Sequence, residues 1–171
     1  YGVGVYKSVN NGVSWSLTNN GITNTNFSKI WINGQDIFVG TYDGVFYSNN
    51  GGTNWSSINV GLTNLDIRTL FMEGTDLFAG TNDSGLFYSN DNGATWSTAN
   101  VGIYNSSIIS AISHNSIIFV GSEGGGIYSS INNGLSWNAS SFGLTNCKIS
   151  AMATDGVKLY AGGESAGFFS T

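Results

Sequence analysis

An eight-residue motif, called the phrase below, occurs four times in this chain and constrains its fold more than any other feature. Each copy begins with Ser, has Asn or Asp at its third position and Gly at its fifth, and ends in Trp. The copies span residues 8–15, 48–55, 89–96 and 130–137, so that their tryptophans lie 40, 41 and 41 residues apart. A fixed period of this length indicates a chain built of structural repeats. A turn that recurs in every unit is expected to support the fold rather than to perform chemistry.

Short apolar segments fill each unit around its phrase. In one unit they are residues 68–72, 76–80 and 85–89, followed by a segment that begins at Trp96. Segments of about five residues bounded by Gly, Asn, Asp or Ser, without a 3.6-residue apolar period, predict strands rather than helices. A Gly-Leu-Thr-Asn connection or a close variant then leads into the next unit.

Four strands in about 40 residues predict an all-β fold, a β-propeller of four-stranded antiparallel blades with about four repeat units. A β-helix would need shorter coils, and a sandwich would not repeat so closely. Within each phrase a tight hairpin is expected, because Asn and Gly tolerate positive φ. The expected centres of these hairpins are Asn11-Gly12, Asn50-Gly51, Asn92-Gly93 and Asn133-Gly134.

Residues 89–96 follow the pattern Ser-x-Asp-x-Gly-x-Thr-Trp, which resembles the Asp-box of the BNR/Asp-box repeat propellers. The other copies have Asn at the Asp position, and Asn can accept the same backbone hydrogen bonds. The resemblance covers the whole chain and is greatest to repeats of secreted bacterial proteins, which implies an extracellular or cell-surface location. It assigns a structural role to the box residues Ser8, Asn10, Gly12, Trp15, Ser48, Asn50, Gly52, Trp55, Ser89, Asp91, Gly93, Trp96, Ser130, Asn132, Gly134 and Trp137. Each Trp is expected to be buried as a wedge against the next sheet.

The same resemblance places the box between the third and fourth strands of a blade. Two outer strands, at 4–8 and 15–17, would then precede three whole blades, and three strands would follow them. We predict that residues 1–171 form a single propeller domain or a segment of a larger propeller. Strands from both ends could close a further blade, but residues 167–171 would then be surplus because 4–8 fill their place. A truncated propeller or an assembly is therefore favoured over a four-bladed monomer.

The composition narrows the range of partners. Charged residues make up 9% of the chain and the net charge is −5, so there is no basic surface for nucleic acid. No apolar run approaches the roughly 20 residues of a membrane span, and membrane insertion is not expected. Cys147, the single cysteine, allows no intrachain disulfide and is predicted to be a small buried thiol. No cofactor is expected.

The best-known Asp-box enzymes are sialidases, which the resemblance makes the first catalytic hypothesis. Their chemistry uses three arginines for the substrate carboxylate, a Tyr nucleophile with a Glu partner, and an Asp acid/base. This chain has one arginine, Arg68, and Lys lacks the bidentate geometry. We therefore predict no catalytic residues and no enzymatic activity.

One set of acids is a candidate binding site. The loops between the second and third strands carry Asp43, Asp83, Glu123 and Glu164, one per unit, on the face opposite the boxes. Four carboxylates around a central funnel could bind a hard cation such as Ca²⁺ or a cationic peptide. The plainer interpretation is that they keep a weakly charged protein soluble, since their spacing is not that of a Ca²⁺ loop. No metal ligand set is predicted.

The sequence therefore gives three functional hypotheses. The first is a non-catalytic, secreted or cell-surface propeller that acts as a structural or interaction scaffold for a protein partner or for further copies, with self-assembly through unmatched end strands as one form. The second is a carbohydrate-binding or glycoside-hydrolase-related propeller whose catalytic residues lie outside this segment. The third is an assembly factor that resembles the photosystem-stability propellers, although those depend on an arginine patch that this chain lacks.

Overall fold

The computed structural model describes residues 4–144, 148–164 and 167–170, and in these residues it contains strands and turns but no helix. Cys147 and Thr171 lie outside the described residues, so the predicted buried thiol is not addressed. With no helix in the described part, there is also none that could cross a membrane.

Five antiparallel sheets follow one another along the chain. The first pairs β1 (Tyr6–Lys7) with β2 (Ser16–Leu17). The second runs in the order β3 (Phe27–Asn33), β4 (Asp36–Thr41), β5 (Gly44–Ser48) and β6 (Ser56–Ser57). The third contains β7 (Ile67–Glu73), β8 (Asp76–Thr81), β9 (Leu86–Ser89) and β10 (Ser97–Thr98).

The fourth sheet has the same four-stranded order, and the fifth has three strands in the described residues. The fourth contains β11 (Ile108–His114), β12 (Ile117–Ser122), β13 (Ile127–Ser130) and β14 (Asn138–Ala139). The fifth contains β15 (Lys148–Thr154), β16 (Leu159–Glu164) and β17 (Gly167–Ser170). This sequence of two strands, three whole blades and three strands is the one predicted from the repeat.

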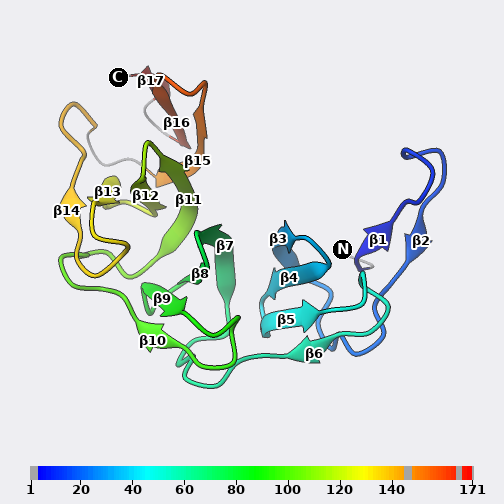
Figure 1. The fold of residues 1–171 in the computed structure, drawn as a ribbon. Coiled ribbons are helices and arrows are strands. Elements are labelled where there is room, and N and C mark those ends of the chain that lie inside the picture. The colour runs from blue at the N-terminus through cyan, green and yellow to red at the C-terminus, as the bar shows by residue number, and fades with distance from the viewer. Residues whose placement is uncertain (1–3, 145–147, 165–166, 171) are drawn as a thin grey trace.

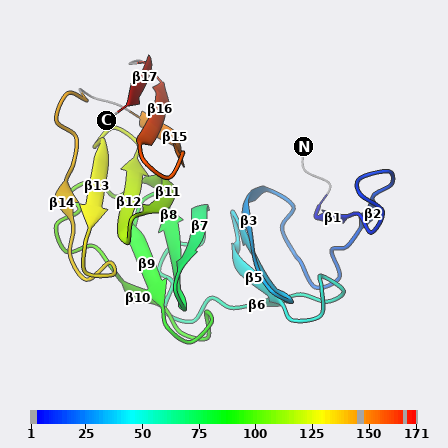
Figure 2. The same cartoon turned by 45° about the horizontal axis from the view of Figure 1, so that its top comes forward.

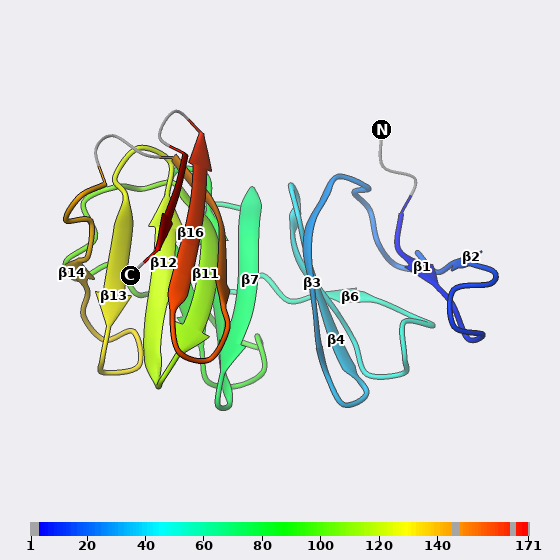
Figure 3. The same ribbon diagram turned by 90° about the horizontal axis from the view of Figure 1, so that it is seen from above.

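The sheets are arranged as an open arc of blades (Figure 1). The first strands of successive blades, β3, β7, β11 and β15, contact one another along the inner side of this arc. The sheet β1–β2 lies at one end of this arc and β15–β17 at the other (Figure 1). The view from above shows β3–β6 between β1–β2 and the remaining sheets (Figure 3). In the view turned by 45°, the two end sheets are again well separated (Figure 2). The described strands of the two ends do not pair with each other, so no further blade is closed within the chain.

The hydrophobic core lies between neighbouring sheets. One cluster joins Phe38 and Val45 of the β3–β6 sheet to Ile67 and Leu77 of the next sheet. The second strand of each whole blade is buried on both sides, whereas the outer strands are two residues long and exposed. Each blade therefore depends on its neighbour to exclude water from its faces.

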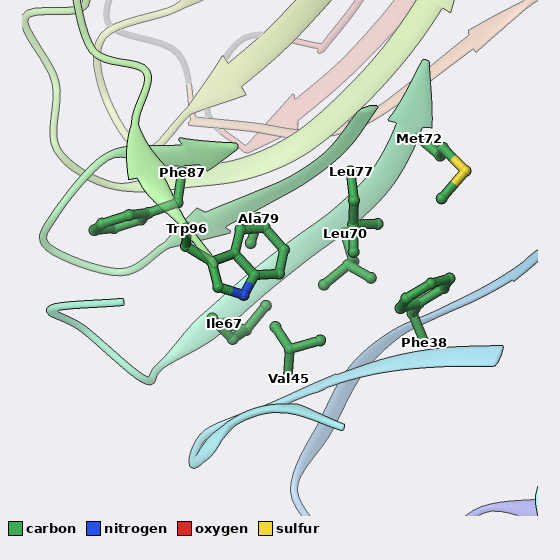
Figure 4. Packing of buried hydrophobic residues seen from close by; sticks show 9 residues of the cluster. All are labelled: Phe38, Val45, Ile67, Leu70, Met72, Leu77, Ala79, Phe87 and Trp96. Atoms are coloured by element: carbon green, nitrogen blue, oxygen red, sulfur yellow. The ribbon is translucent and has the colours of Figure 1, made fainter. Parts of the chain in front are cut away.

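A box tryptophan closes each of these interfaces. Trp96, 4% exposed, lies among residues of both sheets (Figure 4). Its indole N–H donates to the carbonyl of Ile58 at 2.7 Å, and its backbone N–H donates to the carbonyl of Val60 at 2.8 Å. Both acceptors belong to the preceding blade. The prediction of a wedge against the next sheet was therefore wrong in direction, because the box hairpin folds back toward the blade before it.

The other box tryptophans repeat or break this arrangement. The indoles of Trp55 and Trp137 donate to the carbonyls of Thr18 and Ala99 at 2.8 and 2.9 Å, and both side chains are buried. Trp15 is the exception, with 62% of its surface exposed. No preceding sheet is described for Trp15 to pack against, so the prediction of burial fails at this copy alone.

At each interface that holds a box tryptophan, a glycine leaves room for the tryptophan backbone. A Cβ built on Gly21, Gly61 or Gly102 would overlap with the carbonyl oxygen of the box tryptophan that packs on it. All three glycines also have positive φ. The repeated Gly of the connection is therefore required both by the backbone conformation and by the close approach of the next box.

Local hydrogen bonds hold all four boxes in one conformation. The leading Ser hydroxyl accepts from the backbone N–H of the box Gly at 2.8–2.9 Å. The Asn or Asp Oδ1 accepts from a backbone N–H four residues on at 2.9–3.0 Å, whether it is Asn10 or Asp91. Asn thus replaces Asp in the turn, as predicted. The hairpin centre of the second box is Gly51-Gly52 rather than Asn50-Gly51, since these glycines carry the positive φ angles.

We predict that the wedge dominates the stability of a blade interface. Trp96→Ala should lower the free energy of unfolding by about 3–5 kcal/mol, because it empties a packed site and removes an indole hydrogen bond. The matched change Trp15→Ala should have little effect on the dilute monomer, because that side chain is exposed. Denaturant unfolding followed by circular dichroism tests both. Equal losses in the two variants would contradict the packing argument.

A second prediction concerns acid stability. Hydrogen bonds from Ser89, Thr95 and the backbone lower the pKa of Asp91 from 3.8 to about 2. A carboxyl with a depressed folded-state pKa stabilises the fold above its unfolded pKa, and this contribution is lost as the pH falls from about 4 to about 2. Asp91→Asn should therefore flatten the pH dependence of stability across that range.

The converse change, Asn132→Asp, should steepen the same pH dependence, because the Ser136 hydroxyl can donate to the new carboxylate as Thr95 does to Asp91. Thermal unfolding midpoints measured from pH 5 to pH 2 check both variants. An unchanged slope in Asp91→Asn would show that the box carboxylate is not linked to folding.

Candidate functional site: a mixed-charge pocket on the inner strands

The four predicted acids lie at one end of the blades, beside the connections between units. Thr23 of one connection donates to the Asp43 carboxylate at 3.1 Å. Asn105 of another connection donates through its amide to the backbone carbonyl of Glu123 at 3.2 Å. The strands β3 and β4 pair in the same register as β11 and β12. The loops that follow β4 and β12, which carry Asp43 and Glu123, therefore lie at the same end of their blades.

Only two of the four acids are brought together. Lys148, at the start of β15, lies 3.1 Å from a Glu123 carboxylate oxygen and 3.4 Å from one of Glu164. Asp43 contacts Thr23, and Asp83 contacts the amide of Asn82 at 3.3 Å. Among the described residues no group of three His, Cys, Asp or Glu side chains could hold a metal ion. Lys148 therefore occupies the place where a cation would neutralise the two glutamates.

A second ion pair faces the same region from β7. Arg68 binds the Asp66 carboxylate at 2.7 Å, and its guanidinium carbon lies 4.8 Å from the centre of the Tyr42 ring. Burial lowers the pKa of Arg68, but the Asp66 hydrogen bond and neighbouring negative charges outweigh it, so the pKa is raised overall. Within the described part of the chain, the buried atoms Arg68 Nε, Asp66 Oδ1 and Ser28 Oγ have no hydrogen-bond partner.

These groups line a polar pocket of about 300 Å³, which we call the axial pocket. Its lining is Ser28, Tyr42, Arg68, Ile109, Glu123, Lys148, Ser150 and Glu164. An adjoining pocket of about 230 Å³ shares Ser28, Arg68, Ile109 and Ser150, which occupy one repeat position on the four inner strands. The axial pocket therefore offers charged donors and acceptors side by side, an arrangement suited to a ligand that carries groups of both kinds.

The ion pair shifts the pKa values of two groups that line the pocket. The Lys148 hydrogen bond and charge lower the pKa of Glu123, and Glu123 in turn raises the pKa of Lys148. A glycosidase general acid needs a raised carboxyl pKa, so that it is protonated at the working pH. The pKa of Glu123 is shifted in the opposite direction.

Sequence reasoning overlooked the cations of this pocket. Lys148 and Arg68 lie 80 residues apart in the sequence, so their positions alone do not indicate that they meet. A signal was present, since the repeat position shared by Ser28, Ile109 and Ser150 is charged only at Arg68. Recognising it required knowing that first strands meet along the inner side of the arc.

Known proteins resemble this chain in both its box and its blades. Residues 87–98 match the BNR/Asp-box repeat. An ancestral GH74 enzyme is 26% identical, with a TM-score of 0.73 over 94% of this chain and 24% of its own. The extracellular domain of BT4673 from B. thetaiotaomicron is 19% identical, with a TM-score of 0.76 over 98% of this chain and 23% of its own. YCF48 bound to D1 peptide is 13% identical, with a TM-score of 0.70 over 97% of this chain and 56% of its own.

No curated protein matches the chain. The chain spans about a quarter of the length of the first and second of these solved structures and about half of the third. Its sheets are the blades of a β-propeller, as predicted. Residues 87–98 thus carry a BNR/Asp-box repeat, and the hydrogen bonds of its box recur in the other three copies.

We predict that Lys148 keeps the pKa of Glu123 low. Lys148→Met should raise the pKa of Glu123, because it removes the hydrogen bond and charge that depress it. Carboxyl chemical shifts followed by NMR during a pH titration measure this change. Lys29→Met, at the neighbouring pocket and outside this ion pair, is the matched control and should leave Glu123 unchanged. A Glu123 titration identical in both variants would refute the assignment.

Proposed function

We propose that this chain belongs to a non-catalytic, secreted or cell-surface propeller that acts as an interaction scaffold and associates with further copies through its end sheets. The observation that carries the proposal is the contrast between Trp15, 62% exposed, and its three buried counterparts. A folded box with an exposed indole is an interface residue without its partner, since buried tryptophan is prominent among residues that dominate protein interfaces.

The distribution of hydrogen bonds and charges supports a scaffold. Each box uses its polar side chains to fold its own hairpin. In the axial pocket Lys148 pairs with Glu123, and Arg68 pairs with the neighbouring Asp66. A site for general acid catalysis would instead hold a carboxyl that burial keeps protonated.

The likeness to the extracellular domain of BT4673 supports an extracellular location. The structure of YCF48 with D1 peptide supports a polypeptide as ligand, because a propeller of similar fold holds one there. The axial pocket of this chain would suit a peptide with both charged and amide groups, since Arg68 and Glu123 offer a donor and an acceptor.

The second candidate is a carbohydrate-binding propeller whose catalytic residues lie outside these residues. The 26% identity to an ancestral GH74 enzyme favours it. In that case the axial pocket would hold sugar hydroxyls, with the Tyr42 ring as a stacking surface beside Arg68.

Two measurements on the purified chain separate these functions. The scaffold predicts concentration-dependent association in sedimentation velocity and no release of reducing sugar from a polysaccharide panel. The carbohydrate candidate predicts a glycan-array signal that Arg68→Ala removes, with Lys158→Ala as a surface control. A monomer at every concentration with an Arg68-dependent glycan signal would replace the first proposal by the second.

A further inference from the structure

A largely apolar pocket of about 430 Å³ lies between the β11–β14 sheet and the β15–β17 sheet. We call it the socket. Six of its lining residues have counterparts in an earlier blade interface: Phe119, Ile127, Ser140, Leu144, Leu159 and Ala161. Two repeats earlier, the equivalent residues form the interface cluster that contains Trp96: Phe38, Val45, Ile58, Leu62, Leu77 and Ala79. Figure 4 shows Trp96 in one cluster with four of those earlier residues, of which Val45 and Ala79 lie next to the indole.

The same correspondence holds for the intervening interface, where Trp137 packs with Phe78, Leu86, Ile118 and Val120. In both filled interfaces, four lining positions come from the sheet before the wedge and two from the sheet that carries it. The socket has the same division, with four residues from the β11–β14 sheet and two from β16. It is therefore a blade interface that is complete except for its tryptophan.

Backbone acceptors continue the series into the socket. Box indoles donate to the carbonyls of Thr18, Ile58 and Ala99, and the next residue in that series is Ser140. Box backbone N–H groups donate to the carbonyls of Asn20, Val60 and Val101, and the next residue is Phe142. Ser140 and Phe142 both line the socket. By this correspondence, the carbonyl of Ser140 would accept from the indole N–H of an incoming box tryptophan, and the carbonyl of Phe142 would accept from its backbone N–H.

Gly143 gives independent support. It follows Gly21, Gly61 and Gly102 in the repeat and shares their positive φ. At those three glycines the box tryptophan backbone fills the space where a Cβ would lie, whereas at Gly143 nothing lies within 4 Å. The backbone is therefore shaped for a close contact that the described residues do not supply.

We infer that the socket binds the Asp-box of a second copy of this chain, residues 8–15, with Trp15 as the wedge. This inference rests on the proposed function, because it specifies how copies associate. The Trp15 box is already folded by the same hydrogen bonds as the buried boxes, so docking requires little ordering. The contact would have the same tryptophan packing as the three blade interfaces within the chain.

Strand positions define the geometry of this contact. β1 and β17 occupy the same step of the repeat, so the incoming β1 takes the edge of β16 that β17 occupies in the single chain. The contact is therefore a strand exchange, in which pairing of β16 with the incoming β1 replaces its pairing with β17. Because one strand pairing replaces another, the net free energy of association comes from burial of Trp15. Because the two surfaces lie at opposite ends of the arc, the association is head to tail and can continue into a polymer (Figure 1).

Sedimentation velocity on three single variants tests the socket. Trp15→Ala removes the wedge, and Gly143→Asn blocks the backbone approach with a residue that tolerates positive φ. Each should weaken association by more than about tenfold, as expected for loss of a buried interface tryptophan. Gly74→Asn, at another positive-φ glycine with nothing within 4 Å, is the matched control and should associate like the wild type.

Mixing the first two variants provides the sharper test. Trp15→Ala retains its socket and Gly143→Asn retains its wedge, so the mixture should form one-to-one dimers that cannot extend. Circular dichroism of each variant confirms that it is folded.

Three outcomes would overturn the inference. If the wild type associates and both variants associate equally well, the socket is wrong while self-association stands. If the mixture polymerises, the contact is not head to tail through these two surfaces. If the wild type remains monomeric, proposed self-association fails too, and the socket belongs to another occupant, such as a box of a longer polypeptide.

Discussion

The rest of the structure depends on one interaction, the donation of an indole N–H from each buried box tryptophan to a carbonyl of the preceding blade. The indole reaches across the boundary between two sheets, so that a residue of one unit completes the core of the interface. A four-stranded sheet alone would leave both faces in water, and the wedge makes neighbouring blades cooperative. The period of about 41 residues is the sequence spacing that places one wedge at every boundary.

The boxes and the axial pocket divide the polar groups of the chain between two tasks. In the boxes, uncharged side chains suffice, because backbone N–H groups need only an oxygen acceptor and Asn10 provides one as well as Asp91 does. On the inner strands, charges are paired across units, as Lys148 is with Glu123 and Glu164. Four of the charged residues thus line one pocket where the first strands of neighbouring sheets meet.

The strand pattern, the blade composition and the box role could all be predicted from the residues, because each depends on contacts within one repeat. Prediction failed where contacts link different repeats. The wedge direction was reversed because the period does not reveal which neighbour a hairpin leans on. The acidic ring was predicted from four equivalent loops, yet Lys148, at the start of β15, neutralises two of these acids. Trp15 was expected to be buried because its box matches the others, although burial also needs a preceding sheet.

By itself the sequence determined a repeated all-β unit, the conformation of its box turn and the order in which strands form blades. These follow from local hydrogen bonds, glycine conformations and apolar periodicity, which act over a few residues. Only the tertiary structure decided that Trp15 is exposed, that Gly143 faces open space and that Arg68 and Lys148 line one pocket. Those properties depend on which surfaces meet across tens of residues, and equivalent repeats acquire different surroundings according to their place in the arc.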